Sequence, residues 1–412
     1  MKILLSHPSG NQFFRHLAAA FYRRGMLSEV ATCVNWSSRQ RNWFDMLLPH
    51  VVRQELARRS FDDTWATRLH SRPLLETVRL VGQRFGIKLG QAHETGWCSV
   101  DAVYQDFDRW LARQLPTWQR EALDAVYAYE DGALAVFLAS HSLGMRCYYD
   151  LPIAYWETGR RLMSEEAERL PAWAQTLGGG VRDSPAKLER KTRELELADM
   201  VVVPSQFVAD SLPIWVQTKR VVVAPFGSPP LSIEERLPAP TARRFRVLFA
   251  GSMGQRKGLG DLFAAMRLLK RSDVELVVMG SSMAPMDFYR REFADFTYEE
   301  GRPHDQVLAL MRSCDVLVLP SIVEGRALVM QEAMSQGLPI IITPNTGGED
   351  LIEEDRTGFL VPIRSPERIA EKISWLADHR AEAVEMGRLA QCKAEACTWA
   401  NYGDIVCAAV AS

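Results

Sequence analysis

The chain has 412 residues, which is enough for two or three domains, each with its own core. Hydrophobic residues make up 47% and charged residues 24%, as in an ordinary globular protein, and a net charge of -2 gives no reason to expect a nucleic-acid partner. The charge is uneven: residues 1–120 carry 17 Lys/Arg and 10 Asp/Glu, a net of +7, and the remainder carries a net of -9. This asymmetry reflects either scattered solvated faces or a basic N-terminal surface that meets an anionic membrane or an acidic acceptor.

The first residues and the cysteines bear on where the protein resides. Residues 1–6 have no basic region followed by a long apolar run, and no stretch of about 18 apolar residues occurs. The seven cysteines lie far apart without metal-ligand spacing, so we expect reduced, buried thiols. The sequence therefore predicts a cytoplasmic protein, with peripheral contact at the inner membrane face as a further option.

The N-terminal segment has the pattern that opens a doubly wound α/β domain. Residues 2–6 form a short apolar run that ends in the loop Pro8-Ser9-Gly10-Asn11. Residues 13–24 follow as a predicted helix, because Phe14, Leu17, Ala18 and Phe21 share one face at helical spacing. Strand, loop and helix in this order are typical of parallel α/β layers.

The rest of the first half is harder to interpret. Residues 35–125 are rich in Trp, Arg and Leu and are predicted to be a mostly helical insertion. Strands are predicted at residues 133–140, 152–155, 200–203 and 221–224.

A proline-rich linker separates the two halves. Residues 225–242 contain five prolines, which oppose both helices and central strands. A second α/β series follows, with strand-length apolar runs at residues 246–250, 274–279, 316–319 and 340–343. We expect an N-terminal domain at 1–225, a linker at 226–242, a C-terminal domain at 243–390 and a terminal helix at 391–412. Two such lobes form a cleft between the carboxyl ends of their strands, where open α/β sheets bind ligands.

The most informative motif lies in residues 320–362. A predicted strand ends in a loop with Glu324-Gly325, and Glu332 lies eight residues further on, about two turns into a helix. A carboxylate can accept hydrogen bonds from two neighbouring hydroxyls, as a sugar or ribose diol offers. Taken alone, Glu332 would be better interpreted as a residue of a solvated helix face.

The complete pattern, PS-x-x-EG-x6-EAM-x-x-G-x-P, resembles the signature of retaining family-4 glycosyltransferases with the GT-B fold. The trailing Gly-Gly and the GFLV segment fit as well. The resemblance covers residues 200–362 and is weaker over the first 150. It implies an α/β GT-B protein with two doubly wound, Rossmann-like lobes that face a cleft.

The resemblance also implies roles for the motif. Glu324 would bind a hydroxyl of the donor sugar, Glu332 would bind the ribose, and Gly325 with the amides near Ala327, Leu328 and Val329 would hold the sugar or the diphosphate. The family usually has an aromatic residue and a glycine after Glu-Gly. Arg326 and Ala327 stand there in this chain, and this leaves the donor sugar open.

A second candidate site follows the strand at residues 246–250. Gly251 would let the backbone approach a phosphate, while Arg256 and Lys257 would supply positive charge. A helix-capping turn with a surface Arg-Lys pair is the alternative. The segment resembles the family's basic diphosphate clamp, with Lys257 as the best match. Ser252 replaces the arginine that the family often has, and Arg256 would compensate.

Three weaker candidates complete the set. Gly10 and Asn11 lie where the resembled family has a loop facing the donor, although an ordinary strand-to-helix turn would look the same. Either Glu157 or His141 would fill the place of a family histidine at the donor sugar. The Thr398-Trp399 segment resembles the helix that crosses back to the first lobe.

The resemblance implies a retaining hexosyltransferase without metal or cofactor, in which Lys257, Arg256 and helix-terminal amides stabilise the leaving diphosphate. The donor would be a UDP-, GDP- or ADP-sugar, and the acceptor a glycan or lipid-linked saccharide in polysaccharide or glycoconjugate biosynthesis. The alternatives are a catalytically silent nucleotide-sugar-binding partner and an epimerase or phosphorylase of the same fold. A dehydrogenase is disfavoured because no G-x-G-x-x-G fingerprint is present.

Overall fold

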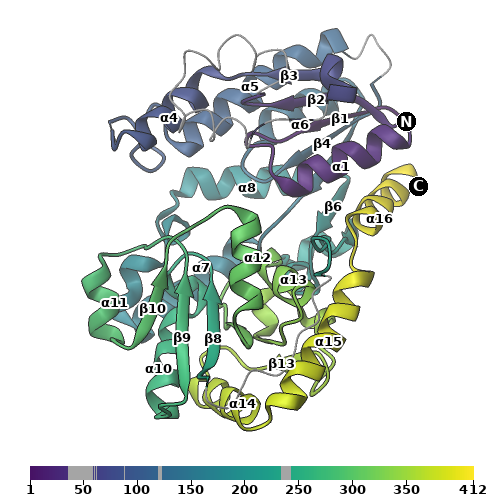
Figure 1. Ribbon diagram of the computed structural model, residues 1–412. Coiled ribbons are helices and arrows are strands. Elements are labelled where there is room, and N and C mark those ends of the chain that lie inside the picture. The colour runs from purple at the N-terminus through teal and green to yellow at the C-terminus, as the bar shows by residue number, and fades with distance from the viewer. Residues whose placement is uncertain (36–58, 60, 62, 88, 119–122, 233–242) are drawn as a thin grey trace, which may run out of the picture.

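The computed structural model describes residues 1–35, 59, 61, 63–87, 89–118, 123–232 and 243–412. This part of the chain forms two parallel sheets with helices on their faces, and the two resulting lobes lie one above the other in Figure 1. Among the described helices, none combines the length and the apolar character that crossing a bilayer requires. The predicted linker and the predicted insertion lie partly outside the described residues.

The N-terminal lobe is built on a sheet with the strand order β3-β2-β1-β4-β5-β6-β7, in which all described pairs are parallel. Both faces are covered, because Ile3 and Leu5 pack on α1 while Leu4 packs on the opposite side with α5 and α6. The strands are β1 (Ile3–Ser6), β2 (Leu27–Thr32), β3 (Leu69–Ser71), β4 (Ala125–Tyr129), β5 (Arg146–Asp150), β6 (Met200–Val203) and β7 (Arg220–Val223).

The helices of the first half alternate with these strands. Helix α1 begins where the side chain of Asn11 accepts a hydrogen bond from the amide of Phe14. The helices are α1 (Gln12–Arg23), α4 (Leu74–Arg84), α5 (Val100–Trp118), α6 (Leu134–Ser142), α7 (Trp156–Arg169), α8 (Pro185–Leu197) and α9 (Gln206–Ser211), with 3-10 turns η1 (Asp63–Arg68), η3 (Pro171–Thr176), η4 (Gly179–Arg182) and η5 (Ile214–Thr218).

The strand predicted at residues 133–140 is wrong, because this segment forms α6. Carboxylates distant in sequence accept its first amides. Glu194 accepts from Ala133 at 3.1 Å, and Asp108 accepts from Ala135 at 2.6 Å. A short run that is apolar all round is compatible with either element, and the deciding partners cannot be located from local sequence.

Two further predictions for this lobe need correction. Residues 152–155 follow β5 as a loop instead of forming a strand. The described part of residues 35–125 is mainly helical, as predicted, but it also contributes the edge strand β3, which pairs with β2. Its three residues are too short to carry a readable alternation of apolar and polar side chains.

The C-terminal lobe has the sheet order β10-β9-β8-β11-β12-β13, again parallel. Its strands are β8 (Phe245–Ala250), β9 (Val274–Met279), β10 (Phe296–Glu299), β11 (Val316–Leu319), β12 (Ile340–Ile342) and β13 (Gly358–Leu360). Its helices are α10 (Leu259–Leu269), α11 (Met286–Glu292), α12 (His304–Arg312), α13 (Leu328–Ser335), α14 (Pro366–Asp378), α15 (Arg380–Ala396) and α16 (Trp399–Ala411), with 3-10 turns η6 (Gln255–Lys257), η7 (Pro344–Thr346) and η8 (Glu349–Leu351).

A segment from the first half of the chain packs on the C-terminal lobe. Trp173 of η3 is buried in the core of that lobe, and its indole donates to Glu292 at 3.0 Å. Glu166 of α7 is fully buried and accepts from Arg169 at 2.7 Å and from Gln255 at 2.8 Å. Residues 156–182 therefore act as an arm that ties the two lobes together.

The end of the chain ties them a second time. Helix α16 begins where the hydroxyl of Thr398 accepts from the amide of Asn401, and it packs against α1. Tyr402 and Val406 share a buried cluster with Ile3 of β1. Figure 1 shows α15 and α16 running along one side of the molecule from the lower lobe to the upper.

A buried carboxyl group at the end of β5 makes the stability of the fold depend on pH. Asp150 is 2% exposed and accepts from the hydroxyl of Tyr127 at 2.6 Å. Burial raises the pKa of Asp150 from 3.8 to about 7. The folded state therefore binds this proton more tightly than the unfolded state, and the contribution of Asp150 to stability is lost as pH rises from about 4 to about 7.

Asp150→Asn keeps an oxygen that accepts from Tyr127 and removes the ionisation. We expect the stability of the variant relative to wild type to rise between pH 4 and pH 7, by about 1–4 kcal/mol, and to stay constant above pH 7. Denaturant unfolding at a series of pH values measures this difference. Asp210→Asn, at an exposed carboxylate on α9, is the matched control and should show no such trend. A pH-independent difference for Asp150→Asn would contradict the prediction.

Candidate active site

The two motifs that the sequence singled out meet at the end of β11. Oε1 of Glu324 lies 2.6 Å from Nη1 of Arg256 and 2.8 Å from Nζ of Lys257. The side chains of Glu324 and Lys257 are only 11% and 13% exposed, so these charges interact in surroundings partly shielded from water. One carboxylate therefore holds two cations side by side.

A glycine fixes the loop that carries the two cations. Gly258 has φ +75°, and a Cβ atom at this position would lie 2.0 Å from the carbonyl oxygen of Pro320. Only glycine fits this conformation and this close approach. The amide of Ile322 also donates to the carbonyl of Arg256 at 2.9 Å, so the loop is bonded directly to the segment that carries Glu324.

A cavity of about 920 Å³ opens beside Lys257. It lies at the carboxyl ends of β8 and β9, where open α/β sheets bind ligands, and the first residues of α12 and α13 close it. Its lining residues are Ala250, Gly251, Lys257, Met279, Arg302, Pro303, His304, Val307, Ala327, Leu328, Val329 and Glu332.

The cavity gathers several of the predicted donor-binding residues, from both motifs: Gly251, Lys257, Ala327, Leu328, Val329 and Glu332. Ala327 precedes α13 without a side-chain cap, so the first amides of that helix are available to an anion. Ser252 follows Gly251 but does not line the cavity, and Gly325 lies at the contact between the lobes.

Glu332 occupies the second turn of α13. Its side chain is 17% exposed, and Oε1 lies 3.7 Å from Nδ1 of His304. Burial raises the pKa of the Glu332 carboxyl, and the nearby His304 opposes the shift. The carboxylate thus lies in the cavity wall with an imidazole as its nearest ionic partner.

Sequence reasoning missed the wall formed by Arg302, Pro303 and His304. These residues follow β10, a strand that was not predicted from the sequence. Had that strand been recognised, the polar loop after it would have indicated a candidate site. The phenyl ring of Phe296 in β10 is covered by the guanidinium of Arg290, 3.9 Å from the ring centroid.

Arg326 departs from its predicted role. Its side chain has no exposed surface and turns away from the cavity, with Nη1 2.6 Å from Oδ1 of Asp350 and Nε donating to Gln331 at 2.9 Å. It lines a separate cavity of about 340 Å³, together with Gly347 and Asp350. Arg326 is therefore a structural residue, because its carboxylate and amide partners satisfy the guanidinium locally.

The loop after β1 is organised by His7, which sequence reasoning also missed. Nδ1 of His7 accepts from the amides of Ser9 at 3.0 Å and Gly10 at 3.2 Å. Burial lowers the pKa of His7 to about 3, so the imidazole is neutral. Gly10, with φ +57°, and the helix-capping Asn11 are thus fixed in position, although neither lines the cavity.

His141 and Glu157, the two residues predicted as alternatives for contact with the donor sugar, lie in different helices. His141 lies in the last turn of α6, where its Nε2 is 2.8 Å from the carbonyl oxygen of Leu197, and it follows no strand as the prediction required. Glu157 lies exposed in the first turn of α7, after the loop whose Pro152 contacts Gly325. The geometry therefore removes His141 from the candidate set and leaves Glu157 as a prediction.

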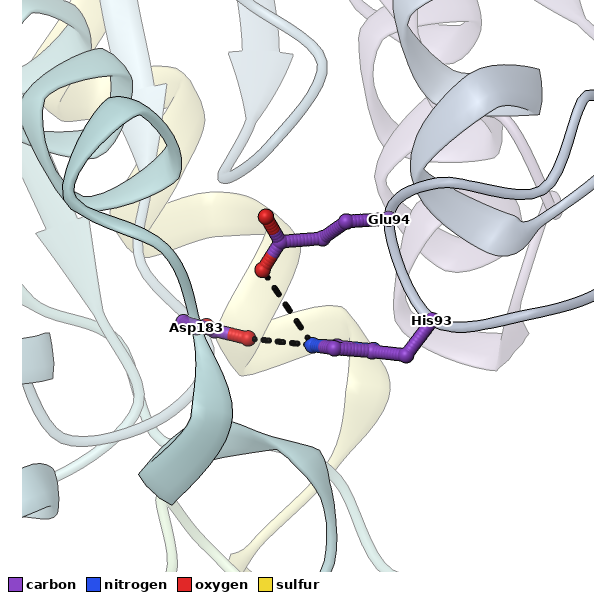
Figure 2. Close-up of side chains that lie close together, drawn as sticks. All are labelled: His93, Glu94 and Asp183. Atoms are coloured by element: carbon purple, nitrogen blue, oxygen red, sulfur yellow. Dashed lines mark hydrogen bonds and ion pairs between the residues drawn. The ribbon is translucent and has the colours of Figure 1, made fainter.

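Away from this site, one group of side chains among the described residues has the spacing of metal ligands. Nε2 of His93 lies 3.0 Å from Oδ1 of Asp183 and 3.2 Å from Oε1 of Glu94 (Figure 2). Nζ of Lys187 lies 3.0 Å from the same oxygen of Asp183, and Glu94 accepts from the amide of Ser184 at 2.9 Å. These contacts satisfy the carboxylates as an ion-pair cluster.

Comparison with solved structures identifies the architecture. Sucrose-phosphate synthase from Thermosynechococcus elongatus superposes with a TM-score of 0.65 at 16% identity, covering 100% of this chain and 98% of that one. HepE from Anabaena, in complex with UDP, superposes with a TM-score of 0.60 at 14% identity, covering 100% of each chain. The chain has the GT-B fold, as predicted.

In the C-terminal lobe, residues 244–379 match the family Glycosyl transferases group 1. D-inositol 3-phosphate glycosyltransferase from Paenarthrobacter aurescens is 28% identical over 255 residues, 56% of this chain and 61% of that protein. The amylovoran biosynthesis glycosyltransferase AmsK from Erwinia amylovora is 24% identical over 191 residues, 43% and 47% of the two chains. This chain thus spans about half the length of these curated relatives. The match over residues 244–379 bears out the predicted resemblance to this family of glycosyltransferases.

Proposed function

We propose that this chain is a retaining glycosyltransferase that moves a sugar from a nucleoside-diphosphate sugar to a hydroxyl group of an acceptor. The observation that carries the proposal is the meeting of Glu324 with Arg256 and Lys257 beside the 920 Å³ cavity. Two cations and unpaired helix amides suit a diphosphate, and the carboxylate of Glu332 suits the two hydroxyls of a ribose.

In the proposed reaction, the bond between the anomeric carbon and the diphosphate oxygen breaks, and a bond from that carbon to the acceptor oxygen forms. The bonding electron pair stays on the diphosphate oxygen, which develops negative charge, and the proton of the acceptor hydroxyl passes to the leaving diphosphate or to water. Lys257, Arg256 and the first amides of α13 would stabilise that charge as it develops. Glu324 would orient both cations and accept a hydrogen bond from a hydroxyl of the sugar.

The donor and the acceptor are finer parts of the proposal. The solved structures of HepE contain UDP and UDP-glucose, so a uridine nucleotide is the first donor to try, with GDP- and ADP-sugars beside it. AmsK acts in amylovoran biosynthesis, so a glycan or lipid-linked saccharide is the class of acceptor that we propose. A cytoplasmic location would suit a nucleotide-sugar donor.

Calorimetric titration with UDP, GDP and ADP tests the donor site. We expect one of them to bind, and we expect Glu332→Ala to weaken that binding by about 10- to 100-fold, because hydrogen bonds to a charged group contribute about 1.5–3 kcal/mol. The matched control is Glu395→Ala, at an exposed glutamate of α15, which should bind as wild type does.

Activity is then followed as release of the nucleoside diphosphate from the sugar nucleotide that binds, without an acceptor and with saccharide acceptors. Slow release that an acceptor accelerates supports a transferase. Binding without any release would identify a silent nucleotide-sugar-binding partner instead. If no nucleotide bound, the proposed donor site would be wrong.

A further inference from the structure

Exposed apolar side chains are concentrated in one short part of the N-terminal lobe. Of the sixteen large apolar residues exposed among those the structure describes, eight lie within residues 74–100. Leu89 is 80% exposed, Leu74 69% and Phe85 63%. The eight residues, which we call the α4 surface, are Leu74, Val78, Val81, Phe85, Ile87, Leu89, Trp97 and Val100.

Helix α4 is amphipathic, but its apolar face points outward and its inward face carries a buried ion pair. Leu74, Val78, Val81 and the C-capping Phe85 follow at intervals of four, three and four residues, so they share one stripe, and that stripe faces outward. The face turned inward carries Glu76, which is 3% exposed and accepts from Arg79 at 2.7 Å. A helix that buries its ion pair and presents its apolar stripe needs an apolar partner outside the described fold.

The loop that extends this stripe is held in a defined shape. A Cβ atom on Gly90 would lie 2.2 Å from Nε1 of Trp97, so the indole rests directly on the backbone of that glycine. Gln91 donates to the carbonyls of Arg79 and Ile87, each at 3.1 Å, which fastens the loop to α4. The hydrogen bond between His93 and Asp183 anchors the same loop just before the start of α8 (Figure 2).

Within the described part of residues 69–118, the exposed side chains of Lys, Arg, Asp and Glu are all arginines. Arg72, Arg84, Arg109 and Arg113 are exposed. The carboxylates of residues 69–118 are much less accessible, and the most exposed of them, Asp106, is 28% exposed and paired with Arg72. An apolar surface with Trp and Phe, in a segment whose exposed charged groups are arginines, is complementary to an anionic lipid interface.

We propose that the α4 surface inserts into the interface of an anionic bilayer and holds the protein there as a peripheral membrane protein. The arginines would contact lipid phosphates while the apolar stripe enters the region just below them. Figure 1 shows α4 in the upper lobe, at the far end from α16. The α4 surface shares no residue with the proposed donor cavity, whose lining comes from residues 250–332.

Co-sedimentation of the full-length protein with vesicles tests this proposal. We expect binding to phosphatidylcholine vesicles that contain phosphatidylglycerol, and binding at least about tenfold weaker to phosphatidylcholine alone. Phe85→Ser/Leu89→Ser should lower the affinity for the anionic vesicles at least about tenfold, because binding then no longer transfers two large apolar side chains from water into the bilayer interface. Arg84→Glu/Arg113→Glu should weaken binding and reduce its dependence on salt.

The matched control is Ile214→Ser/Leu268→Ser, which removes two other exposed apolar side chains and should bind vesicles as wild type does. Equal binding by wild type and Phe85→Ser/Leu89→Ser would overturn the proposal. The proposal would also be overturned if the wild-type protein did not bind anionic vesicles but self-associated, and if Phe85→Ser/Leu89→Ser abolished that self-association. Calorimetric nucleotide binding by each variant reports on the donor site, so failure of either proposal is distinguishable from failure of the other.

Discussion

Lys257→Ala is expected to lower the turnover of the sugar nucleotide by about 100- to 1000-fold, the usual effect of removing one group that stabilises a developing negative charge. Lys257 lines the cavity, and its ammonium group lies 2.8 Å from Glu324. The same lysine lies against the backbone of Gly251, since a Cβ atom there would be 3.2 Å from its Cδ. Its charge is therefore held at a fixed place beside the cavity.

The stability of this variant should change little. Arg256 remains 2.6 Å from Glu324, so removal of Lys257 leaves no unpaired buried carboxylate, and we expect the free energy of unfolding to change by no more than about 1 kcal/mol. Steady-state turnover and denaturant unfolding measure the two quantities separately. Lys393→Ala is the matched control, because it removes a lysine of α15 that is paired with Glu353, and it should retain full activity. Turnover within about fivefold of wild type for Lys257→Ala would exclude the diphosphate role.

The sequence predicted the C-terminal lobe better than the N-terminal lobe, and the reason is physical. The strands β9 and β11 coincide with the predicted apolar runs, because central parallel strands are buried on both faces and read as continuous apolar segments. In the edge strand β10 only the first residue, Phe296, is buried, so the strand has no continuous apolar run, and it was missed together with the cavity wall that follows it.

Long-range partners explain the remaining failures. Helix α6 begins at carboxylates from α5 and α8, and Arg326 is fixed by Asp350, 24 residues away. His7 looked like an ordinary residue after a strand, because only the folded loop brings the amides of Ser9 and Gly10 to its ring. Local patterns indicated which residues carry charge, and the fold decided which of those charges are already neutralised.

The contact between the lobes gives the second large expected effect. Gly325 lies against the loop that follows β5, and a Cβ atom there would lie 1.7 Å from the carbonyl oxygen of Pro152 and 3.0 Å from Cα of Ile153. These atoms belong to the backbone, so no side-chain rotation can relieve the clash. The carbonyl of Gly325 also accepts from the hydroxyl of Ser205 at 2.6 Å, which holds the same contact from the other side.

Gly325→Ala should therefore force the lobes apart at the residue next to Glu324. We expect destabilisation by about 1–3 kcal/mol from the overpacked contact and a loss of turnover of about 100-fold, because a displacement of about 1 Å can misplace reacting groups to that extent. Thermal unfolding and steady-state kinetics at saturating donor measure both effects. Gly301→Ala is the matched control, because a Cβ atom at that position would have no heavy atom within 4 Å apart from its own chain neighbours.

The split between binding and turnover in Gly325→Ala distinguishes two roles for this contact. The cavity is lined by residues of the C-terminal lobe alone, so nucleoside-diphosphate binding should survive the substitution even where turnover falls. Loss of both together would mean that the contact shapes the donor cavity itself. Retention of both, with unchanged thermal stability, would mean that the lobes work without this contact. In that case the positioning of Glu324 would depend on Arg256 and Lys257 instead of on the opposite lobe.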